Sequence, residues 1–235
     1  MTTLPDFSIL EKQINVQFKN KELLRQAFTH RSYINEHKGS SFEHNERLEF
    51  LGDAVLELAS TSFLFKKYPK RNEGELTSFR AALVNTNTLS EVASKLGFND
   101  FLLLSKGEAK DTGRARQYIL ADTFEAMIGA IYLDQGYDAA YAFIDTNLLG
   151  LTDEIVKTGS WIDAKSYFQE KSQEVLSVTP LYETIQEEGP DHNKYFTVAV
   201  KIKDETIATG KGKSKQEAEQ EAARNALEKK EWMPV

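Results

Sequence analysis

Two groups of acidic side chains interrupt apolar segments that have helical spacing. In the first, Glu46, Glu49 and Asp53 stand at positions i, i+3 and i+7 and therefore share one face of a helix. In the second, Asp122 and Glu125 stand three residues apart in a mostly apolar run. If the two helices pack side by side, every carboxylate except that of Glu46 points to one place. Such a cluster repels itself unless protons or a cation neutralise it.

The chemistry that this arrangement supports is metal-assisted hydrolysis of a phosphodiester. Carboxylate oxygens are the ligands that a hard divalent ion such as Mg²⁺ prefers. A bound ion lowers the pKa of a water ligand and stabilises charge on the leaving oxygen. An acidic stripe is also the ordinary solvent-facing side of an amphipathic helix, so that interpretation stays open for the first group. Gly52 favours the metal-site interpretation. Glycine inside a helix costs about 1 kcal/mol relative to alanine, and the close approach of another group to the helix would explain its presence.

A second constellation lies near the C-terminus. Lys211, Lys213 and Lys215 alternate up to the point where a helix is expected to begin, with Ser214 as its cap. The exposed N–H groups and the partial positive charge of a helix N-terminus add to the lysines and make a phosphate-binding corner. The alternative is a solvated loop with ordinary surface lysines, and spacing alone does not decide between the two.

The composition excludes several other classes of site. There is no cysteine among the 235 residues, which rules out disulfides and thiolate metal sites. The four histidines do not have the spacing of a metal motif. No apolar run reaches the roughly 20 residues of a membrane helix, and residues 1–30 contain no signal-peptide core. We therefore expect a soluble, cytoplasmic protein.

The net charge of −7 argues against a protein that coats nucleic acid through bulk attraction. Residues 1–150 carry a net charge of −3, and residues 151–235 carry a net charge of −4. Neither half is basic, so any binding of nucleic acid has to depend on local patches such as the lysine corner.

The patterning predicts two domains. Residues 1–150 have apolar side chains at intervals of three and four and show no strand alternation, which is typical of an all-α helical bundle. Helices are expected to end at Tyr68-Pro69, Gly97 and Gly136. Residues 151–160 are polar, end in Gly-Ser and are predicted to contain the tail of a helix followed by a short flexible linker.

Residues 161–231 are predicted to form a small α+β domain. The segment 195–202 alternates cleanly, which indicates a strand within a three-stranded antiparallel sheet. The final helix has alanines on its inward face. The elements are expected in the order α-β-β-β-α, at residues 163–176, 181–186, 195–202, 206–210 and 215–229.

Three blocks of the first domain resemble the ribonuclease III family. Residues 45–53, Asn-Glu-Arg-Leu-Glu-Phe-Leu-Gly-Asp, are similar to that family's hallmark nonapeptide. Residues 73–77 with Arg80, and residues 121–126, resemble its other two blocks in the same order. Residues 163–230 resemble a double-stranded-RNA-binding domain. The motifs that carry this second resemblance are Gln169-Glu170, Gly-Pro-Asp-His at 189–192, Lys213-Ser214-Lys215 and Ala218-Glu219.

The resemblance implies an endoribonuclease that cleaves double-stranded RNA to 5′-phosphate and 3′-hydroxyl ends with short 3′ overhangs, and that processes rRNA and mRNA precursors. It implies Mg²⁺ as the cofactor, with Mn²⁺ as a substitute, and a homodimer formed through the catalytic domain, with no membrane partner. Glu49, Asp122 and Glu125 would be metal ligands. Asp53 would be a further ligand or would orient the attacking water. The resemblance also implies that Asp53 and Glu125 are the catalytic residues. Glu46 would lie at the dimer contact near the site.

The second domain is expected to read the shape of A-form RNA rather than its sequence. By resemblance, its RNA-binding residues are Gln169, Glu170 and Gln173 for one minor groove, His192 for the next, and Lys213, Ser214 and Lys215 for the phosphates between them. Many relatives carry a further lysine where this chain has Gln216. With one cation fewer, we expect somewhat weaker and less salt-dependent binding.

Three rival functions remain open at this point. A double-stranded-RNA-binding protein with an idle catalytic fold is disfavoured by the presence of all four carboxylates. A metal phosphohydrolase that acts on small molecules is disfavoured by the RNA-binding domain. A structural bundle with an accidental acidic seam would require both stripes to be coincidental.

Overall fold

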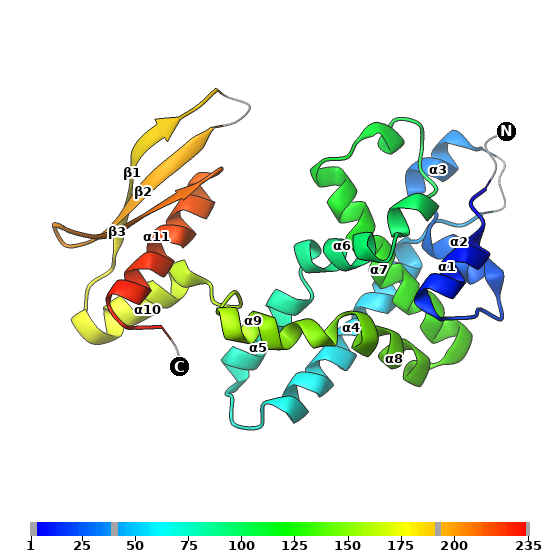
Figure 1. The fold of residues 1–235 in the computed structure, drawn as a ribbon, viewed down its shortest axis with the longest axis horizontal. Coiled ribbons are helices and arrows are strands. Elements are labelled where there is room, and N and C mark those ends of the chain that lie inside the picture. The colour runs from blue at the N-terminus through cyan, green and yellow to red at the C-terminus, as the bar shows by residue number, and fades with distance from the viewer. Residues whose placement is uncertain (1–3, 39–41, 191–193, 234–235) are drawn as a thin grey trace. The chain divides into compact units, whose positions relative to one another are not determined.

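The computed structural model describes residues 4–38, 42–190 and 194–233, and the chain separates into two compact units, Met1–Trp161 and Ile162–Val235. The first unit is all-α. The second contains a three-stranded antiparallel sheet with helices, which confirms the predicted fold class (Figure 1). Among the described residues, no helix combines the length and the apolar character needed to cross a membrane.

The helices of the first unit end where the sequence contains residues that stop a helix. Its α-helices are α1 (Phe7–Ile14), α2 (Lys21–Ala27), α3 (Arg31–Glu36), α4 (Glu46–Lys67), α5 (Glu73–Leu83), α6 (Thr86–Lys95), α7 (Arg114–Gln135), α8 (Tyr137–Asn147) and α9 (Thr152–Thr158). Short 3₁₀ helices occupy Phe98–Phe101, Glu108–Lys110 and Leu149–Leu151. Helix α4 stops before Tyr68-Pro69, as predicted. Helices α6 and α7 stop before Gly97 and Gly136, whose φ angles of +71° and +88° suit glycine.

Helices α4 and α7 are the two longest, with 22 residues each, and they pack against one another at the centre of the unit (Figure 1). Helices α2 and α8 contact both members of the pair, α5 contacts α4, and α6 contacts α7. The core contains large side chains that are completely buried, among them Leu56, Phe28, Phe98, Phe124 and Met127. Burial of each contributes about 1.5–3 kcal/mol. The central pair is therefore held rigidly, which is what a site shared between two helices requires.

Residues 151–160, for which the tail of a helix and a short linker were expected, contain the seven-residue helix α9. Two acidic residues, Asp153 and Glu154, stand in the first turn, and Gly159 ends the helix in a left-handed conformation with φ +67°. Asp153 also pairs with Lys67 at 2.5 Å and accepts a hydrogen bond from the Tyr68 hydroxyl. These contacts join α9 to the end of α4.

The second unit follows the predicted order α-β-β-β-α. Its elements are α10 (Ala164–Leu176), β1 (Leu181–Glu188), β2 (Tyr195–Ile202), β3 (Glu205–Gly212) and α11 (Lys215–Lys229). The bounds of β2 and α11 match the sequence prediction, whereas β1 and β3 are longer than expected. The strands are neighbours in the order β1-β2-β3, and both pairs are antiparallel.

Helix α11 lies directly on strand β3 because both surfaces are made of small residues. A Cβ atom on Gly210 would lie 2.1 Å from the backbone nitrogen of Ala222, and one on Gly212 would lie 2.5 Å from that of Ala218. The inward-facing residues predicted for α11 are all buried, namely Ala218, Ala222, Ala223, Ala226 and Leu227. This close packing fixes the start of α11, and with it the lysine corner, relative to the sheet.

Candidate active site and RNA interface

The carboxylates meet because α4 and α7 approach with their backbones almost in contact. A Cβ atom on Gly52 would lie 1.8 Å from the carbonyl oxygen of Glu125, and one on Gly129 would lie 2.2 Å from that of Leu48. Glycine is the residue that permits such an approach. The packing role that the sequence suggested for Gly52 is therefore confirmed, and it places the acidic residues of the two helices side by side.

Three of the four predicted carboxylates come together at this crossing. Glu49 on α4 and Asp122 and Glu125 on α7 each offer an oxygen, and these oxygens all lie within 4.8 Å of one another. All three side chains are half-buried. Asp53 is exposed and stands outside this group. Glu46 is also exposed, and it pairs with Arg31 at 3.4 Å and with His44 at 3.7 Å.

The cluster is electrostatically strained without a cation. Burial, followed by the charges of Asp53, Asp122 and Glu49, raises the pKa of Glu125 to about 8. Burial and the charges of Asp122, Glu46 and Asp53 likewise raise the pKa of Glu49 to about 7. Burial raises the pKa of Asp122 as well. Asp53 therefore acts on the cluster through its charge even though its oxygens lie outside it.

This donor set fits a hard divalent cation. The three ligands are carboxylate oxygens, which suit Mg²⁺ or Mn²⁺, and the described part of the chain brings no histidine into the group. The raised pKa values show that the cluster disfavours its negative charges, and a bound ion would neutralise them. It would also keep several waters, because Mg²⁺ is usually bound through only a few carboxylates.

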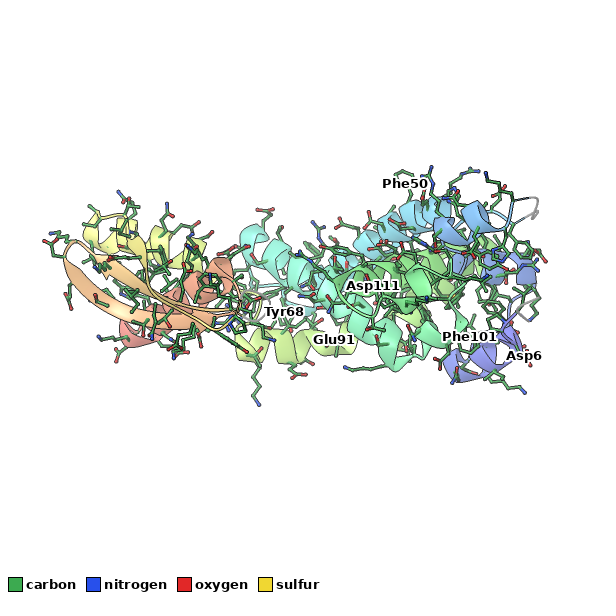
Figure 2. The ribbon with its side chains drawn as sticks, turned by 90° about the horizontal axis from the view of Figure 1, so that it is seen from above. Asp6, Phe50, Tyr68, Glu91, Phe101 and Asp111 are labelled. Carbon is green, nitrogen blue, oxygen red and sulfur yellow. The ribbon has the colours of Figure 1, made fainter. Side chains whose placement is uncertain are left out.

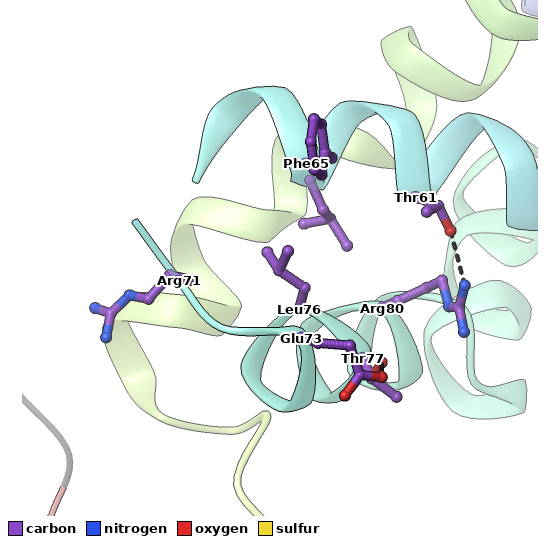
Figure 3. Close-up of a pocket in the computed structure, with 8 residues that line it drawn as sticks. Thr61, Phe65, Arg71, Glu73, Leu76, Thr77 and Arg80 are labelled. Atoms are coloured by element: carbon purple, nitrogen blue, oxygen red, sulfur yellow. Dashed lines mark hydrogen bonds between the residues drawn. The ribbon is translucent and has the colours of Figure 1, made fainter. Parts of the chain in front are cut away.

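The α4–α5 side of the unit holds features to which the sequence analysis assigned no role. A pocket of about 460 Å³ lies there, and at its edge Arg80 donates a hydrogen bond to the Thr61 hydroxyl at 2.7 Å (Figure 3). Arg80 also pairs with Glu57 at 3.4 Å. Glu75, in the same block of sequence, completes a capping box with Asn72 at the start of α5.

Helix α4 also presents exposed apolar side chains that the sequence analysis did not separate from the core. Phe50 is 81% exposed, Leu58 is 57% exposed and Phe65 is 71% exposed. Figure 2 labels Phe50 on the outside of α4. These residues fall within about 80° of the helix circumference. Their spacing was the available signal, since large apolar residues on the face that also carries Arg47 and Thr61 cannot all be buried inside one subunit.

In the second unit, the residues predicted for the first minor groove form one surface. Gln169, Glu170 and Gln173 are exposed on α10 and line a shallow hollow together with Ser166 and Thr179. Their amide and carboxylate groups are suited to the 2′-hydroxyls and base edges that A-form RNA displays there. The remaining groove residue, His192, lies outside the described residues.

The lysine corner forms around the first turn of α11. The Ser214 hydroxyl accepts a hydrogen bond from the backbone N–H of Glu217 at 3.1 Å, which is the predicted cap. Lys213 and Lys215 are exposed on either side of it. The Glu217 carboxylate accepts from the backbone N–H of Lys213 at 2.8 Å, and the ammonium of Lys215 lies 3.2 Å from Glu187. Carboxylates of the protein itself thus stand where phosphates are expected.

Known proteins are similar to this chain in both sequence and fold. The family model described as Ribonuclease-III-like matches residues 20–151, and the one described as double-stranded RNA binding motif matches residues 164–230. A "Ribonuclease 3" from Bacillus licheniformis is 47% identical over 226 residues, which are 95% of this chain and 89% of that protein. A "Ribonuclease 3" from Bdellovibrio bacteriovorus is 45% identical over 94% of both chains.

A solved structure of the nuclease domain of ribonuclease III from Campylobacter jejuni matches as well. It has a TM-score of 0.55 and 40% sequence identity, and the match covers 60% of this chain and 98% of that one. The matched blocks include the helices that carry the carboxylates, and the second unit has its own matching model. The chain belongs to the ribonuclease III family, and it is an endoribonuclease with a double-stranded-RNA-binding domain.

Proposed function

We propose that the enzyme cuts both strands of double-stranded RNA with Mg²⁺ held by Glu49, Asp122 and Glu125, and that it works as a homodimer. The products would have 5′-phosphate and 3′-hydroxyl ends with short 3′ overhangs. The observation that carries the proposal is the meeting of three carboxylate oxygens within 4.8 Å on two helices held together by glycines. The physiological setting we propose is the cytoplasm, with structured precursors of rRNA and mRNA as substrates.

Each acidic residue has a distinct role in this proposal. Glu49, Asp122 and Glu125 hold the cation, and Mn²⁺ can take its place. When bound, the metal supplies a nucleophilic water and stabilises charge on the leaving oxygen. Asp53 is exposed beside the cluster, where its carboxylate would accept a hydrogen bond from the attacking water and orient it, or would add a further ligand. Its charge also favours binding of the cation.

The second unit supplies the preference for duplex RNA. Gln169, Glu170 and Gln173 on α10 would face one minor groove, and His192 the next. Lys213, Ser214 and Lys215 would hold the phosphates between the two grooves. Such a domain spans about 16 base pairs, so it reads shape and the 2′-hydroxyls rather than sequence.

The exposed apolar residues of α4 support dimerisation through the catalytic domain. A two-fold axis makes each contact twice, with residue i of one subunit against residue j of the other. If two α4 helices cross antiparallel near Leu58, each Phe50 comes opposite the partner's Phe65, because the two positions lie on either side of Leu58 at nearly equal distances of about 11 Å along the helix. The likeness to the Campylobacter jejuni nuclease domain agrees, since that domain has a region involved in dimer formation.

The pocket beside Phe65 is suited to receive the phenyl ring of Phe50 from the other subunit. It is lined by the apolar side chains of Leu64, Phe65 and Leu76, with Arg80 at its polar edge (Figure 3). Phe50 is next to Glu49 in sequence, so its insertion would place the metal cluster of one subunit near the dimer contact. Exposed Glu46, one turn earlier on α4, would lie near that contact too.

The proposal is tested with a duplex RNA that carries a different label on each strand. We expect cuts on both strands that require Mg²⁺ or Mn²⁺, are offset by a short distance and leave 5′-phosphate ends. Cleavage of only one strand would contradict the dimeric geometry. Binding of the duplex without cleavage in any divalent ion would instead favour the idle catalytic fold. Turnover of mononucleotides but not of duplex RNA would favour the small-molecule phosphohydrolase.

A further inference from the structure

Glu187 links two lysines near the proposed phosphate-binding corner. It is the penultimate residue of β1 and pairs with Phe196 in the register of β2. One carboxylate oxygen lies 3.2 Å from the ammonium of Lys215, and the other lies 3.3 Å from that of Lys194. The two lysines belong to different segments, the first turn of α11 and the residue before β2, so the carboxylate joins them.

The surroundings hold the Lys215 ammonium in this position. Its nitrogen lies over the ring of Phe196, 5.5 Å from the ring centroid. Hydrogen bonds from Lys215 and Lys194 lower the pKa of Glu187, so its carboxylate is charged at neutral pH. Glu217, another glutamate of the corner, differs, because its carboxylate accepts from the backbone N–H of Lys213 and pairs with no ammonium among the described residues.

We propose that Glu187 is an affinity-determining residue whose carboxylate occupies the place of an RNA phosphate between Lys194 and Lys215, so that RNA binds by displacing it. This inference rests on the proposed role of Lys215 in holding phosphates. A carboxylate and a phosphate both bind a lysine ammonium through charge-assisted hydrogen bonds, and they compete for the same donors. Glu187 therefore keeps the affinity for RNA below what the lysines alone would supply.

The salt dependence of binding follows from the same competition. A lysine that neutralises a phosphate releases counterions from RNA, and this release makes binding weaker as salt rises. In this domain, RNA binding must also break the ion pairs of Glu187 with Lys194 and Lys215. The free energy needed to break them offsets part of the free energy gained by releasing counterions. Removing the charge of Glu187 should strengthen binding most at low salt, and the difference should narrow as salt rises.

The test measures binding of the full chain to a labelled RNA duplex without divalent ions, between about 50 and 200 mM salt. Glu187→Gln should lower Kd by about two- to fivefold at the lowest salt, as expected for an exposed ion pair. Glu183→Gln is the matched control. Glu183 lies on the same strand and pairs with Lys201 at 2.5 Å, and its replacement by glutamine changes the net charge by the same amount. It should leave Kd nearly unchanged.

Each outcome separates the inference from the proposed function. If Glu187→Gln and Glu183→Gln lower Kd equally, the effect is net charge and the inference fails. If Glu187→Gln raises Kd, the carboxylate organises the lysines for binding, which also overturns it. If Lys215→Ala raises Kd but Glu187→Gln does nothing, only the inference fails. If Lys215→Ala leaves Kd unchanged, the phosphate-binding role of Lys215 fails with it.

Discussion

Replacing Gly52 with alanine tests whether the contact of α4 with α7 builds the site. The new Cβ would lie 1.8 Å from the Glu125 carbonyl oxygen and 2.9 Å from the backbone nitrogen of Gly129. An ordinary contact begins at 3.4 Å, so the helices would have to separate locally by about 1.6 Å. No rotamer change relieves the clash, because both neighbours are backbone atoms.

The expected loss of stability follows from two opposing terms. Overpacking of a close-packed interior costs about 1–3 kcal/mol, and a backbone clash of this size belongs at the upper end. Alanine returns about 1 kcal/mol through its helix propensity. We therefore expect the free energy of unfolding of the catalytic unit to fall by about 2 kcal/mol, which lowers its Tm by roughly 4–8 °C. The same separation moves Glu125 away from Glu49, so Mg²⁺-dependent cleavage should fall as well.

The control is Gly150→Ala, because a Cβ at Gly150 would meet nothing within 4 Å. Both variants are compared with the unchanged chain by thermal unfolding followed by circular dichroism. The Gly150 variant should keep its Tm to within about 1–2 °C. Equal stability of the Gly52 and Gly150 variants would refute the reasoning that close approach of the two backbones holds α4 against α7.

Three further predictions concern the cluster and the dimer. Mg²⁺ should raise the Tm of the unchanged chain, because it binds only the folded state, and the rise should vanish in a Glu49→Gln/Asp122→Asn variant; an equal rise in that variant would place the ion elsewhere. The folded-state pKa values of Glu49 and Glu125, about 7 and about 8, lie above the value of 4.5 expected when unfolded. Without metal, the stability that protonation of Glu49 and Glu125 contributes is complete below pH 4.5 and is lost as pH rises through 7 to 8. The Tm measured in a chelator should therefore fall between pH 4.5 and 8. A constant Tm over this range would contradict the raised pKa values. Phe50→Ala should convert the dimer to a monomer in light scattering and leave the helical circular dichroism unchanged, since the side chain is 81% exposed in the subunit, whereas an unchanged dimer would exclude this face.

Local residue chemistry accounts for the parts of the structure that the sequence predicted well. Pro69 and Gly136 end their helices independently of contacts with the rest of the chain. The alternation of Tyr195–Ile202 defines a strand for the same reason. The meeting of Glu49 with α7 was predictable because two narrow acidic stripes on apolar helices can be buried together only if they face each other.

The parts that could not be predicted depend on contacts between distant segments. A helix tail was expected near residues 151–160, but the pairing of Asp153 on α9 with Lys67 on α4 was not, because no local pattern shows it. Asp53 lies one turn after Glu49 on α4, yet it is exposed and its carboxylate stands outside the group that Glu49 forms with Asp122 and Glu125. The contact of Glu187 with Lys215 requires the register of the sheet and the packing of α11 on it, both of which arise only in the folded domain.

The central claim is that three carboxylates hold the ion that drives strand cleavage. Its most direct test compares Glu125→Gln with the unchanged chain in single-turnover cleavage of duplex RNA, with RNA affinity measured in parallel. Loss of several kcal/mol of metal-derived stabilisation should slow cleavage at least about a hundredfold. The Kd for RNA should stay the same, because Glu125 belongs to the other unit. Full activity of Glu125→Gln in Mg²⁺ would contradict the claim.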